Sequence, residues 1–108
     1  MLQEKEMQQR FETIEQAIGL AAQASSVERD LPRELRDCIA RLDHQSGLVR
    51  QAMRSCDELL LRQAIGELEA LGGRAKLVCA SGARLTLQMK DAVLWLHSEL
   101  AALNRHMQ

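Results

Sequence analysis

Cysteine and histidine are the residues of this chain whose side chains can support nucleophilic, redox or metal chemistry. The three cysteines form no CxxC pair and stand at no zinc-type spacing from a histidine. Each lies on the apolar side of a helical pattern, where a free cysteine packs as a small hydrophobic residue and burial raises its pKa. We therefore expect three structural thiols, in a reducing compartment such as the cytoplasm, at positions Cys38, Cys56 and Cys79.

The three histidines do not form a ligand set for a metal. Helical bundles build di-iron centres from Glu-x-x-His pairs, and no glutamate stands three residues before any histidine here. A CxxCH haem-attachment motif is also missing. His44 is expected on the polar face of a helix, His97 on the flank of another, and His106 near a helix C-terminus, where a cation is mildly favourable. We expect no metal and no cofactor.

His44 supports a second hypothesis for function. A histidine phosphotransfer domain is also a four-helix bundle of about this size, and its exposed phosphoacceptor histidine lies midway along the second helix, a place comparable to that of His44. The family motif puts a lysine and then a glycine after the histidine. Here Gly47 comes one residue early, the segment Asp43–Leu48 contains no lysine, and Asp43 adds a negative charge beside the acceptor. The analogy concerns the fold, and we keep a histidine phosphotransfer-like signalling domain as the alternative function.

The elements that position these side chains follow from the spacing of apolar residues. In four segments such residues recur at alternating spacings of three and four, the pattern of an amphipathic helix. The first two run through Met7, Phe11, Ile14, Ile18, Ala21 and Ser25, and through Leu35, Cys38, Ile39, Leu42, Val49, Ala52, Met53 and Cys56. The last two run through Leu61, Ala64, Ile65, Leu68, Leu71, Ala75, Val78 and Cys79, and through Met89, Val93, Leu96, Leu100, Leu103 and Met107.

Three breaks divide these segments into helices over about 3–26, 31–54, 56–80 and 83–107. Asp30 is a candidate N-cap for the second helix, before Leu31–Pro32. Ser55–Cys56–Asp57–Glu58 matches a capping box for the third helix, and Ser81–Gly82 marks the last break. Gly72–Gly73 lies in phase with the third apolar face, so we predict one continuous helix whose small residues let a neighbouring helix approach closely.

Four helices of nearly equal length with short connections predict an all-α fold, an antiparallel up-down-up-down four-helix bundle. Composition agrees, because 46% of the residues are hydrophobic and there is a single proline. The chain of 108 residues is too short for two independent cores, so we expect one domain over 1–108.

Charge and composition argue against several classes of partner. The net charge of −1 provides no field that attracts nucleic acid, and 2% aromatic residues leave little for base stacking. The outer face of the second helix carries Arg33, Arg36, Arg50 and Arg54, but acidic residues interrupt this stripe, which fits a solvated face or an acidic patch on a partner protein. The charged N-terminus and the lack of a long apolar run predict no signal peptide and no membrane span.

Gln45 and Ser46 interrupt the apolar face of the second helix near the level expected for His97. Such residues can form a polar layer that fixes the register of the helices, as a buried asparagine does in a coiled coil. The alternative is that they line a small binding site. We favour the structural role.

The fourth helix has more apolar surface than one buried face requires. Leu85, Ala92, Trp95 and Ala102 widen its apolar arc, and Leu87, Leu94 and Ala101 form a separate strip at seven-residue spacing. Surplus apolar area on one helix indicates a partner surface, although it can also serve to cover a neighbouring helix more broadly. We therefore predict a non-enzymatic interaction protein that binds another protein or a second copy of itself through Leu87, Leu94, Trp95, Ala101 and Ala102.

Overall fold

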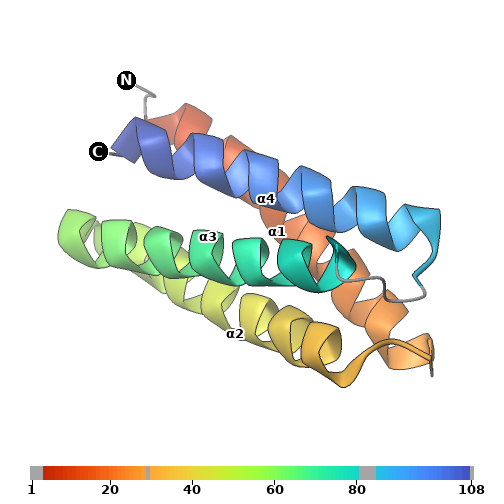
Figure 1. The fold of residues 1–108 in the computed structure, drawn as a ribbon. Helices are drawn as coiled ribbons and strands as arrows, with labels where there is room; N and C mark the ends of the chain where they lie inside the picture. Colours follow the sequence, from red (N-terminus) through yellow and green to blue (C-terminus); the bar gives the residue numbers. More distant parts are fainter. Residues whose placement is uncertain (1–3, 29, 81–84, 108) are drawn as a thin grey trace.

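The computed structural model describes residues 4–28, 30–80 and 85–107, except for the side chains of Glu4 and Met107. They form four helices, α1 (Glu4–Val27), α2 (Arg33–Ser55), α3 (Glu58–Ala80) and α4 (Leu87–Met107). Successive helices run in opposite directions, so the fold is the predicted four-helix bundle (Figure 1). Each helix contacts the next, and α1 also contacts α4, which closes the ring in a body of 40 × 21 × 19 Å.

The core is made by the apolar faces that the spacing predicted. One cluster of buried side chains lies toward the α2–α3 turn and includes Phe11, Ile14, Ile18, Leu42, Val49, Ile65, Leu68, Leu96, Leu100 and Leu103. A second cluster lies toward the opposite end and includes Ala21, Leu31, Leu35, Cys38, Ile39, Ala75, Val78, Cys79, Met89 and Val93. The predicted residue Met107 has its side chain outside the described part of the chain.

The turn between α2 and α3 differs from the predicted capping box. Cys56 adopts the left-handed conformation with φ 56°, and the amides of Cys56 and Asp57 close α2 by donating to the carbonyls of Met53 and Ala52. Asp57, not Ser55, caps α3, because its Oδ1 accepts from the Leu60 amide at 3.1 Å. The capping-box prediction was therefore wrong in register, since Ser55 still belongs to α2.

The starts of α2 and α4 also lie later than predicted. Pro32 occupies the N-cap position of α2 without a side-chain cap, so the prediction that Asp30 caps this helix was wrong. Thr86 caps α4, with Oγ1 accepting from the Met89 amide at 3.2 Å. The predicted break at Ser81–Gly82 lies outside the described residues.

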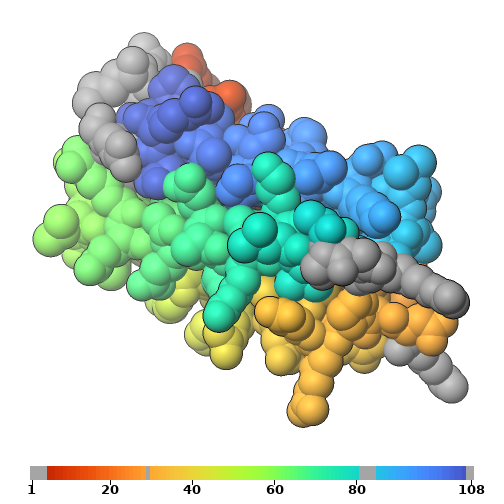
Figure 2. Space-filling view, viewed as in Figure 1, coloured from red at the N-terminus to blue at the C-terminus, as the bar shows by residue number. Residues whose placement is uncertain are grey.

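The α3 helix is continuous through Gly72–Gly73, as predicted. A Cβ atom built on Gly72 would lie 3.3 Å from Leu100 Cδ1 and 3.6 Å from His97 Cα. One built on Gly73 would lie 3.4 Å from His97 Nε2. The glycine pair therefore lets α4 approach α3 closely, and Figure 2 shows the face on which the two helices lie side by side.

Candidate functional site

The sequence predicted three cysteines packed on apolar faces, and the structure buries two of them. Cys38 and Cys79 are buried, and desolvation raises the pKa of both above the ordinary thiol value of 9.0. Cys56 is exposed in the α2–α3 turn, so its predicted place on the apolar face was wrong. The pattern continued one residue beyond the end of the helix, and the left-handed turn then changed the direction of the side chain. Within the described residues no group of three His, Cys, Asp or Glu side chains could hold a metal ion.

The three histidines occupy separate places. His44 is exposed midway along α2, and His106 is exposed in the last turn of α4. His97 is half-buried, with its ring lying over Gly72 and Gly73 of α3. The imidazole of His97 therefore fills the space that the two glycines leave.

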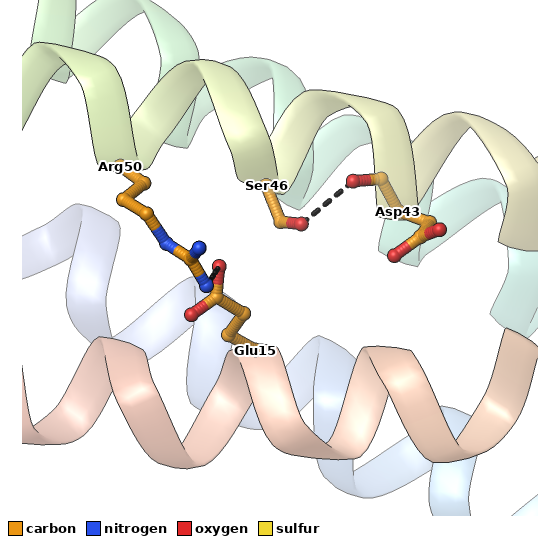
Figure 3. A network of polar contacts seen from close by, with 4 residues as sticks. All are labelled: Glu15, Asp43, Ser46 and Arg50. Atoms are coloured by element: carbon orange, nitrogen blue, oxygen red, sulfur yellow. Dashed lines mark hydrogen bonds and ion pairs between the residues drawn. The ribbon is translucent and has the colours of Figure 1, made fainter.

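The structure does not join Gln45, Ser46 and His97 by hydrogen bonds. The Gln45 amide donates to Glu67 Oε2 at 2.7 Å and makes a longer bond of 3.4 Å to the Ala64 carbonyl, so it ties α2 to α3. Ser46 donates to the carbonyl of Asp43 in its own helix (Figure 3). Gln45 is nine-tenths buried, and its bonds to a neighbouring helix fit a role in fixing register.

Two arginines of the predicted α2 stripe bind α1 or the residue that directly follows it. Arg50 reaches across to the carboxylate of Glu15, as Figure 3 shows, and this hydrogen bond raises the pKa of Arg50. Arg36 donates to the backbone carbonyl of Glu28 at 2.6 Å. These cations are therefore engaged within the bundle, which leaves less of the stripe available to an acidic partner.

The predicted interface residues of α4 lie on its outer side. Leu87 is 74% exposed, Leu94 46% and Trp95 41%, whereas Ala101 and Ala102 are half-buried. Consecutive residues of a helix point about 100° apart, so Leu94 and Trp95 diverge. Leu94 lies toward the α3 flank, three residues before His97, and Trp95 lines a groove between α4 and α1.

The groove beside Trp95 adds α1 residues that the sequence argument missed. It has a volume of about 400 Å³ and is lined mainly by apolar side chains, including Ala17, Leu20, Ala24, Met89, Ala92 and Trp95, with Glu28 at one end. Leu20 is 68% exposed. The missed signal was a second apolar seam in α1, in which Ala17, Leu20, Ala24 and Val27 recur at spacings of three and four.

None of the described helices has the length and apolar character needed to cross a bilayer. Comparisons with protein-family models, with curated proteins and with solved structures found no match for this chain. The arrangement of side chains on α4 and α1 is therefore the ground on which a function can be argued.

Proposed function

We propose that this chain is a non-enzymatic helical protein–protein interaction module, an adaptor, small chaperone or homodimeric bundle, that works through the apolar side of α4. The exposure of Leu87, Leu94 and Trp95 carries this proposal. The share of the core that α4 contributes is already made by other residues of this helix, namely Met89, Val93, Leu96, Leu100 and Leu103.

These side chains gain free energy of binding when a partner covers them. Fully burying one large apolar side chain stabilises by about 1.5–3 kcal/mol. Leu94 and Trp95 are each only about half exposed, so each offers a part of that amount, and Trp95 is of the residue type that most often anchors an interface. The free cysteines fit a reducing location, and we propose the cytoplasm.

Affinity capture from a native lysate tests this function. The baits are the wild type, Leu94→Glu, Trp95→Glu and Gln51→Glu, the last a control that adds the same charge at an exposed position of α2. We expect the two α4 variants to lose proteins that the wild type and the control both retain. The same proteins captured by all four baits would show that α4 is not the binding surface.

His44 is the basis of a second candidate function, phosphotransfer. Its side chain is exposed midway along α2, and a Cβ atom at Gly47, one turn further along, would meet nothing within 4 Å. The space beside the imidazole is therefore open to a phosphodonor. This function predicts acid-labile phosphate on protein isolated from its native cells, present in His106→Ala and lost in His44→Ala. Equal labelling of these two variants would exclude His44 as the acceptor.

A further inference from the structure

The second apolar seam of α1 is separate from the seam that fills the core. Ala17, Leu20 and Ala24 directly precede the buried residues Ile18, Ala21 and Ser25, and Val27 is the last residue of α1. Leu20 is 68% exposed and Val27 78%, and the first three residues of this seam line the groove with Trp95. Ala17 and Ala24 are half-buried, so among the described residues Leu20 and Val27 are the members of this stripe that stay exposed.

We infer that a second copy of this chain covers the stripe, with its α1 antiparallel to the first α1. Two charged residues mark the ends of the stripe. Arg10 lies toward one end of the stripe and Glu28 closes the other, and both are half-buried. Neither forms an ion pair with another described residue. They are 18 positions apart in the sequence, about 27 Å along a helix.

A two-fold axis between Ala17 and Leu20 brings these charges together. It places Arg10 of each copy opposite Val27 of the other, next to Glu28, so that symmetry forms the ion pair twice. Opposite charges at matching ends give an antiparallel pairing both direction and register.

The same register matches large side chains with small ones. Ala17 lies opposite Leu20 of the second copy, and Thr13 opposite its Ala24, as in layers of an antiparallel coiled coil. A shift by seven positions also alternates large and small residues, with Leu20 opposite Ala24. That shift places Arg10 opposite a position six residues past Glu28, about 9 Å further along a helix axis, so the charges select the first register.

This inference rests on the proposed interaction function and names its partner. The α4 residue next to the axis is Trp95, which lines the groove together with Ala17 and Leu20. Leu94 points to the other flank of α4 and lies outside this interface. A test can therefore separate the two sides of α4.

The experiment measures mass against protein concentration by sedimentation equilibrium. We expect the wild type to dimerise and Leu20→Glu to remain monomeric. Arg10→Glu and Glu28→Arg should each weaken dimerisation about tenfold or more, because each turns two attractive pairs into repulsive ones. The double variant Arg10→Glu/Glu28→Arg should return to within about threefold of the wild type.

Leu77→Glu is the matched control, at a leucine of α3 that is 71% exposed, and it should dimerise like the wild type. Circular dichroism of each variant checks that the helices are retained, and the charge exchange restores dimerisation only if the two side chains meet. A monomeric wild type at several hundred micromolar, or a double variant no better than the single ones, would overturn this inference. If the wild type is monomeric but captures a different protein, and Leu94→Glu loses that protein, the dimer inference fails while the proposed function stands.

Discussion

The contact between Gly72 and α4 predicts a strong dependence of stability on the size of this residue. Gly72→Val is the perturbation, and Gly66→Val, in the same helix, is its matched control. A Cβ atom at Gly72 would lie 3.3 Å from Leu100 Cδ1 and 3.6 Å from the backbone Cα of His97. Leu100 is fully buried, so it has little space into which to move. A Cβ atom at Gly66 would meet nothing within 4 Å.

The magnitude follows from two opposing effects. Replacing a glycine inside a helix by valine gains roughly 0.5 kcal/mol from backbone propensity at either position. At Gly72 the three carbon atoms that valine adds must also displace α4, and overpacking of this kind costs about 1–3 kcal/mol. We therefore expect Gly72→Val to be less stable than Gly66→Val by about 2 kcal/mol, or roughly 10 °C in Tm.

Urea unfolding followed by circular dichroism measures this difference. The slope with urea should be the same in both variants, because the surface exposed on unfolding hardly changes, while the midpoint should fall only in Gly72→Val. Gly72→Ala should lie between them, since a single methyl group requires Leu100 to shift by only a few tenths of an ångström. Equal midpoints for the two valine variants would refute the close α3–α4 contact.

Four further predictions concern the thiols and the α2–α3 turn. A thiol reagent should modify Cys56 quickly in the native protein, and Cys38 and Cys79 only after unfolding, because the last two are buried. Burial raises the pKa of both buried thiols above 9.0. Their contribution to the free energy of unfolding is therefore complete below pH 9 and is lost as pH rises through the raised values. Unfolding titrations at pH 8 and 10.5 should show a fall in the free energy of unfolding, and the double variant Cys38→Ala/Cys79→Ala should show a smaller fall. Asp57→Ala should destabilise by about 1 kcal/mol and Ser55→Ala by clearly less, because only Asp57 caps α3, and similar losses in urea titrations would contradict that cap. Cys56→Gly should raise Tm, since glycine relieves the left-handed conformation by about 1 kcal/mol, and an unchanged or lower Tm would show that Cys56 is not strained there.

The helices were predictable because each buries one face, and the spacing of residues such as Ile18, Leu42, Leu68 and Leu100 records that burial directly. The continuity of α3 was predictable for the same reason, since Ala75 and Val78 stay in phase beyond the glycines. The ends of the helices were less predictable from the sequence. Asp30, Ser55 and Asp57 are all residue types that cap helices, and the one that does so is decided by where the chain can turn, as at Cys56.

The candidate interface could be predicted from the sequence only in part. The sequence indicated that Leu94 and Trp95 exceed what the core needs, but it could not show that they point to different flanks, because that depends on where α1 and α3 lie. Leu20 was missed because α1 has a stronger apolar seam, and the second seam lies only one position away from it in the sequence. Whether alanines such as Ala24 fill a core or form the floor of a groove is decided by packing.

The two-residue connection between α2 and α3 also has a kinetic consequence. Only Cys56 and Asp57 separate these helices, so their pairing closes the smallest loop and requires little loss of chain entropy. We expect this hairpin to form before α1 docks. Removing the Gln45–Glu67 bond should then slow refolding, whereas shortening Ile18 of α1 should mainly accelerate unfolding in stopped-flow measurements. The α2–α3 pair would thus act as the template on which the other two helices assemble.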